Sequence, residues 1–164
     1  MSGIPGLYPF PPETASRVQV RAAVLGIVQT MTFTTPINGA TTWNLTSDRL
    51  KLWGDVDPSL QPSAFVVEHA EQYDQRGRGL PRRRQLFKIY CYARTDDPSI
   101  DGGVLLDTML ESFDTYFAID QPGAANLTLG GITYYTRIEG RIFKDPGDID
   151  NQAMLIVPIT AEIP

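Results

Sequence analysis

Two segments of the chain alternate apolar and polar residues with the period of a half-buried β-strand. In residues 85–94 the apolar positions are Phe87, Ile89, Cys91 and Ala93. In residues 152–163 they are Ala153, Leu155, Val157, Ile159 and Ala161. Successive side chains of a strand point to opposite faces of a sheet, so each segment predicts a strand with one buried face. A chain with two such strands must build a sheet whose apolar face is covered by other elements.

Two segments with helical spacing are predicted to provide that cover. Residues 13 to about 31 form the first, with Thr14 or Ser16 as a candidate cap. Its recurring apolar residues are Val18, Ala22, Leu25 and Val28. Residues 100 to about 118 form the second. Its predicted buried stripe is Leu105, Met109, Ser112, Phe113, Tyr116 and Phe117.

Further strands are expected at residues 41–53, 64–70 and 132–144, the last leading through a turn at 145–148 into a C-terminal hairpin. The order helix, strands, helix, hairpin lacks regular βαβ alternation. It therefore predicts an α+β fold, an antiparallel β-sheet with two main helices packed on it and a C-terminal β-hairpin. A length of 164 residues fits one domain over residues 13–164, after an extended proline-rich N-terminal arm at 1–12.

Few residues are available for catalysis or metal binding. The chain has one cysteine, Cys91, which shares the apolar face of its strand, and one histidine, His69, without a nucleophile motif nearby. Three carboxylates crowd one turn, but their spacing is not that of a calcium loop. They are Asp145, Asp148 and Asp150. The sequence therefore predicts no enzyme, no cofactor and no metal site.

The longest apolar run, residues 22–28, is far shorter than the roughly 20 residues of a membrane helix. The first residues also lack the basic and apolar regions of a signal peptide. We therefore expect a protein that is made in a cytoplasm and has no membrane partner.

The net charge of −5 hides a division along the chain. Residues 1–94 contain 11 basic and 7 acidic residues, whereas residues 95–164 contain 3 and 12. Residues 76–94 alone hold seven lysines and arginines and no acid. The first part of that segment, 76–84, is predicted to be a basic loop that becomes ordered on contact. Three interpretations stay open: contact with nucleic-acid phosphates, docking on an acidic neighbour such as a second copy, or a solvated loop.

Several short motifs then occur in a characteristic order. They are Ser-Asp-Arg-Leu-Lys-Leu-Trp at 47–53, Gln-Pro-Ser-Ala-Phe-Val-Val-Glu at 61–68, Leu-Pro at 80–81, Lys-Ile-Tyr-Cys-Tyr at 88–92, Leu-Leu-Asp at 105–107, Thr-Leu-Gly-Gly at 128–131, and Gly140, Asp145, Gly147 and Gln152 around the last turn. With them the chain, from about residue 13 onward, resembles the tail terminator proteins of long-tailed bacteriophages, also called minor tail or tail completion proteins.

The resemblance implies a structural virion protein. Members of this family form a ring, usually of six copies, on the head-proximal end of the tail tube. The ring stops tube polymerisation and joins the head connector, and genome DNA passes through its lumen without specific binding. The partners expected for this chain are therefore other copies of itself, the tube protein and the connector, in a virion made in the host cytoplasm.

Two sets of charged residues are candidates for the contacts of such a ring, because a head-to-tail contact needs two complementary surfaces on each subunit. The basic set, for a subunit or partner interface, is Arg49, Lys51, Arg76, Arg78, Arg82, Arg83 and Arg84. The acidic set is Asp107, Glu111 and Asp114, which would meet a partner, line the lumen so that DNA slides, or be a solvated helix face. The alternatives to a terminator are a head–tail connector or stopper, and a DNA-binding module that uses residues 76–88.

Overall fold

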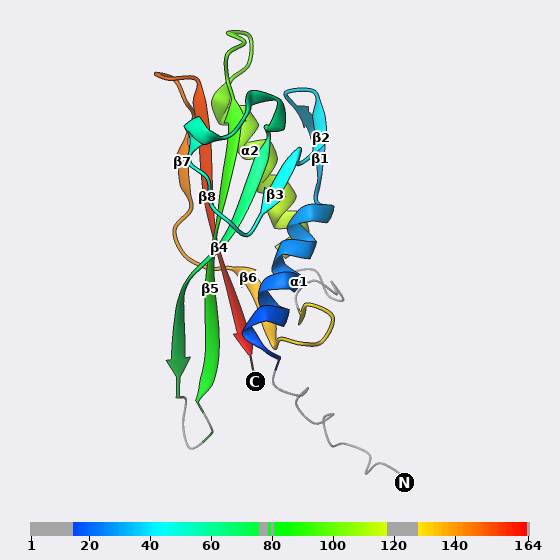
Figure 1. The fold of residues 1–164 in the computed structure, drawn as a ribbon, viewed down its shortest axis with the longest axis vertical. Helices are drawn as coiled ribbons and strands as arrows, with labels where there is room; N and C mark the ends of the chain where they lie inside the picture. The colour runs from blue at the N-terminus through cyan, green and yellow to red at the C-terminus, as the bar shows by residue number, and fades with distance from the viewer. Residues whose placement is uncertain (1–14, 76–78, 80, 118–127, 164) are drawn as a thin grey trace.

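The computed structural model describes residues 15–75, 79, 81–117 and 128–163. The main elements are α1 (Arg17–Thr30), β1 (Thr32–Ile37), β2 (Ala40–Thr42), β3 (Leu45–Ser47), β4 (Ser63–Asp74), β5 (Arg82–Arg94), α2 (Gly102–Phe117), β6 (Tyr135–Ile138), β7 (Phe143–Asp145) and β8 (Gln152–Ile163). Two short 3-10 helices, η1 (Trp53–Asp55) and η2 (Pro58–Leu60), lie between β3 and β4. The chain has the predicted α+β fold (Figure 1). The predicted arm at 1–12 lies outside the described residues.

The main sheet has the strand order β3-β4-β5-β8-β6, and β7 also pairs with β8. Only the short β3–β4 pair is parallel, whereas the other pairs are antiparallel. β5 and β8 pair along almost their whole length, from Arg83 opposite Ile163 to Arg94 opposite Gln152. β1 and β2 form a separate two-stranded ribbon. The long C-terminal strand is therefore an inner strand of the sheet.

Helix α1 begins with a capping box at Ser16. The Ser16 hydroxyl accepts a hydrogen bond from the Gln19 amide (3.1 Å), and the Gln19 side chain accepts one from the Ser16 amide (2.8 Å). The buried face is then Val20, Val24 and Val28. The prediction that Val18 and Ala22 belong to the apolar stripe is wrong, because both are exposed. Val18 lies about 200° around the helix from Val20 and is 73% exposed.

Both helices contribute to one core on one face of the sheet. Its members include Val24 and Val28 of α1, Met109 and Phe113 of α2, and Ile89, Cys91, Leu155 and Val157 of the central strands. The predicted buried faces of residues 85–94 and 152–163 are confirmed. On the opposite face, Phe65 and Tyr92 form a smaller cluster with Val56, which comes from the segment that holds η1 and η2.

The expected strand at 132–144 is divided, so the C-terminal hairpin is interrupted. β6 and β7 pair with separate stretches of β8, and Gly140, with φ of +120°, lies between them. Before and within β6, Tyr134 is exposed whereas Thr133 and Thr136 are buried. The two threonine hydroxyls share a hydrogen bond of 3.1 Å. Hydroxyl pairing therefore lets two polar residues occupy the inward positions.

Two other boundaries differ from the predictions. The strand expected at 41–53 is divided into β2 and β3, after which residues 48–52 leave the sheet. The β4–β5 hairpin is longer than expected at its turn end, because Arg82 pairs with Asp74 in the ladder. The basic loop predicted for residues 76–84 is thus wrong from Arg82 onward, where the chain is already a strand.

Candidate interaction surfaces

The arginines at the start of β5 are held by an acid from β8. Arg82 donates through Nη1 to Oε1 of Glu162 (2.8 Å), and Arg84 donates through Nε to Oε2 of the same carboxylate (3.0 Å). The Glu162 side chain is only 5% exposed. Nη2 of Arg84 also lies 3.5 Å from Oδ2 of Asp74. We call this group of Arg82, Arg84 and Glu162 the arginine clamp.

The charges of the clamp interact inside the chain, where two guanidinium groups share one carboxylate. Burial alone would raise the pKa of Glu162, but the interactions with Arg82, Tyr135 and Arg84 together outweigh it and hold this pKa below its ordinary value. The bond from Glu162 in turn raises the pKa of both guanidinium groups. The neighbouring Arg83 donates through Nη2 to the Ala15 carbonyl (2.7 Å), which ties the chain before α1 to β5. The remaining predicted arginines, Arg76 and Arg78, lie outside the described residues.

The outer edge of β4 is open over most of its length. β3 pairs with β4 only from Ser63 to Phe65, and the rest of the strand pairs with β5 alone within the described part of the chain. In Figure 1 the lower half of β4 forms the margin of the sheet. Ion pairs tie one face of this strand to α1. They are Arg17–Glu71 (2.5 Å) and Arg21–Glu68 (3.0 Å). These pairs fix the side chains of β4 but leave its backbone edge without a neighbouring strand.

Residues 48–52 form a strap across the face of the sheet opposite the helices (Figure 1). The Tyr92 hydroxyl, on that face, donates to the Lys51 carbonyl (2.9 Å) and fixes the strap in place. Leu52 is 71% exposed, and Leu50 is also exposed. Arg49 and Lys51 are exposed, and neither forms an ion pair with another residue that the structure describes. The strap therefore presents free basic and apolar groups together.

The outer face of α2 presents the opposite charge. Asp107, Glu111 and Asp114 are all exposed, as predicted. Asp107 forms an ion pair with Lys144 (2.7 Å), whereas Glu111 and Asp114 have no ion-pair partner in the described ranges. Val104 lies on the same side of the helix and is 58% exposed. We call these four residues the acidic face.

Sequence reasoning found the acidic face and the basic residues of the strap, but it missed two things. It placed Leu50 and Leu52 within a β-rich segment, residues 41–53. It also missed Glu162, which lies 78 residues from Arg84 in the chain. The only signal for Glu162 was a charged residue within the alternating segment at 152–163, on the face opposite Ala161, and that position alone does not name its partner.

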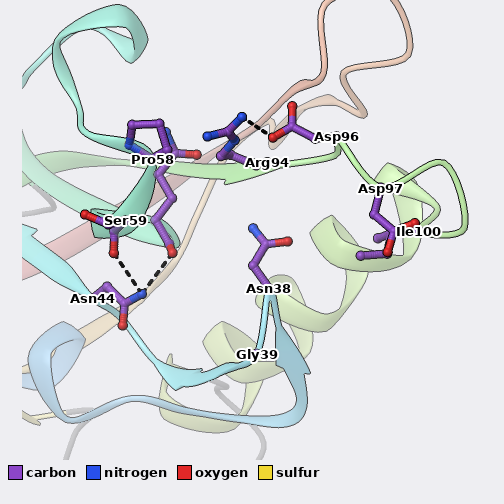
Figure 2. A pocket seen from close by; sticks show the side chains of 10 residues that line it. Asn38, Gly39, Asn44, Pro58, Ser59, Arg94, Asp96, Asp97 and Ile100 are labelled. Carbon is purple, nitrogen blue, oxygen red and sulfur yellow. Dashed lines mark hydrogen bonds and ion pairs between the residues drawn. The ribbon is translucent and has the colours of Figure 1, made fainter.

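A cavity of about 620 Å³ lies beside the end of β5. Its lining comes from the β1–β2 turn, η2, the end of β5 and the loop before α2 (Figure 2). The Asn38 amide, oriented to suit its neighbours, pairs with both backbone groups of Arg94 (3.0 and 3.1 Å). Nδ2 of Asn44 donates to the Gln61 carbonyl (2.9 Å), and Arg94 forms an ion pair with Asp96. These contacts join four segments of the chain and provide no nucleophile–base pair.

The two residues with potential for catalysis lie apart. Cys91 is fully buried in the core, and burial raises the pKa of its thiol well above the ordinary value. His69 is the extra residue of a β-bulge in β4, and partial burial and then the charge of Lys88 lower its pKa. The described residues contain no group of three or more His, Cys, Asp or Glu side chains placed to bind a metal ion.

Comparison with known protein families finds no matching family model, and comparison with curated proteins finds no matching sequence. No helix in the part of the chain that the structure describes is long and apolar enough to cross a membrane. The case for a function therefore depends on the motifs that resemble tail terminators and on the surfaces described above.

Proposed function

We propose that the protein is a structural component of a phage tail, a terminator that forms a ring on the head-proximal end of the tail tube. The ring stops tube polymerisation and provides the surface that joins the head connector. Genome DNA passes through its lumen without specific binding. The proposal begins from the ordered motifs of the sequence, and it requires a chain built to associate with others.

The observation that carries the proposal is the open edge of β4. An unpaired strand edge is a template for pairing with another chain. The β-bulge at His69 divides this edge, and the regular stretch beyond it, from Ala70 to Asp74, is the part open to such pairing. Here the described residues beyond Phe65 pair on one side only. A sheet with an open edge is expected in a protein whose working state is an assembly.

A DNA-binding role for the basic segment is less well supported. Such a role needs cations that are free to contact phosphates. Arg82 and Arg84 instead bind Glu162, and Arg83 binds a backbone carbonyl. Three of the arginines that suggested nucleic acid thus act within the chain.

Native mass spectrometry and negative-stain imaging of the purified protein, at low and high salt and with tube protein present, test the proposal. We expect a closed ring, alone or on the ends of tubes, and tubes that stop growing when the protein is added. A strictly monomeric species under every condition would contradict it. Retention by the portal-side protein but not by the tube protein would instead indicate a connector or stopper.

A further inference from the structure

We propose that the strap of one copy docks on the acidic face of the next copy and forms the subunit contact of the ring. This inference rests on the proposed function, because it names the partner of two surfaces in that assembly. Arg49 and Lys51 would pair with Glu111 and Asp114. The exposed leucines of the strap would cover Val104.

The first argument is that both surfaces have unmatched groups of complementary kinds. The strap presents two cations without an ion-pair partner among the described residues, and the acidic face presents two such carboxylates. Each surface also exposes a large aliphatic side chain, Leu52 on one and Val104 on the other. One contact would neutralise the charges and remove both apolar groups from water.

The second argument is that the two surfaces cannot meet within one chain. The Tyr92 hydroxyl holds the strap on one face of the sheet, whereas α2 packs through Met109 and Phe113 on the other face. Figure 1 shows the strap in front of the sheet and α2 behind it. A contact between unlike surfaces on opposite sides of a subunit joins copies head to tail, and it closes into a ring when the rotation permits.

The third argument concerns spacing along the helix. Glu111 and Asp114 are three residues apart, so they lie on the same side of α2 and about 4.5 Å apart along its axis. Arg49 and Lys51 are separated by a single leucine, and their long stems can reach two carboxylates at that spacing. Val104 lies two helical turns earlier on the same side, where it can receive a leucine from the strap.

Charge reversal tests the pairing. The strap variant carries Arg49→Glu with Lys51→Glu, the helix variant carries Glu111→Lys with Asp114→Lys, and a third protein carries all four changes. Sedimentation velocity at low salt measures self-association, and thermal melting checks folding. We expect each pair of reversals to weaken association at least about tenfold, and the four changes together to restore it, because like charges meet in the first two proteins only. Arg141→Glu with Asp148→Lys is the control, since these exposed residues belong to neither surface.

The outcomes separate this inference from the proposed function. Rings that form and cap tubes equally well with either pair reversed would overturn the inference and leave the function intact. Loss of tube binding without loss of self-association in the strap variant would also overturn it, and would assign the strap to the tube protein. Restoration by the four changes, in a protein that never binds tubes, would support the subunit contact and contradict the terminator role.

Discussion

The arginine clamp and the strap are both basic, but their surroundings differ. In the clamp, the guanidinium groups of Arg82 and Arg84 share a carboxylate that is almost fully buried. In the strap, Arg49 and Lys51 extend into solvent without an ion-pair partner in the described chain. The denser run of basic residues is thus the one that is paired within the chain, and the sparser one is the one that stays unpaired among the described residues. The density of charge in a sequence therefore does not locate a binding surface.

The largest effect that tests this comparison is expected at the acid of the clamp. Glu162→Gln keeps the shape of the side chain but removes the charge that both arginines share. We expect the free energy of unfolding to fall by about 2 kcal/mol, the range for a hydrogen-bonded charged group. Urea denaturation at neutral pH measures it. The exposed Glu139→Gln is the control, and an equal loss in both variants would contradict a special role for the clamp.

The same variant should differ from the wild type in its response to acid. The folded state holds the pKa of Glu162 below its ordinary value of 4.5, so the unfolded chain takes up this proton first as the pH falls. The stabilisation by the carboxylate is complete above that value and is lost as the pH drops through the lowered pKa. The stability difference between wild type and Glu162→Gln should therefore shrink below about pH 4.5. A difference that stays constant through this acid range would contradict it.

The two arginines of the clamp should not be equivalent. Arg84 is 13% exposed and Arg82 is 54% exposed, so water screens the second interaction more strongly. We expect Arg84→Ala to lower the free energy of unfolding by about 1.5 kcal/mol and Arg82→Ala by about 0.5 kcal/mol. Chemical denaturation of the two single variants measures both. The reverse order would show that exposure does not decide the contribution.

The smallest effect on stability is expected in the strap. Arg49→Ala with Lys51→Ala removes two exposed side chains, and we expect the free energy of unfolding to stay within about 0.5 kcal/mol of the wild type. Self-association measured by sedimentation should nevertheless weaken several-fold at low salt. A loss of stability comparable to that of Glu162→Gln would show that the strap stabilises the subunit, and would remove the contrast between the two regions.

The parts of the fold that sequence could predict are those in which a local pattern decides. The alternation around Ile89 and Val157 was sufficient to predict the strands β5 and β8 and their buried faces, because one face of each strand is buried throughout. The buried side of α1 was harder to predict, since Val18 and Val20 are equally apolar, and it is Val20 that lies in line with the buried Val24 and Val28.

The candidate surfaces were harder to predict, because they depend on contacts between residues that are distant in the sequence. Alternation of Arg49, Leu50, Lys51 and Leu52 is compatible with a strand, and only the structure shows that these residues cross the sheet instead of joining it. The acid for Arg84 comes from β8, so no local pattern could show that this arginine is already paired. Exposed acids on a predicted helix, by contrast, follow from helical periodicity alone, and the acidic positions were predicted correctly.

The inner position of β8 affects the order in which the molecule can form. β5 lacks one of its two neighbours until α2, β6 and β7 have been synthesised and β8 has followed. Strand pairs between distant segments form slowly, because the long intervening loop must be ordered first. Glu162 belongs to this late strand, so Arg82 and Arg84 lack this carboxylate in the nascent chain until β8 has been made. The chain therefore completes its sheet late, once translation has passed its last strand.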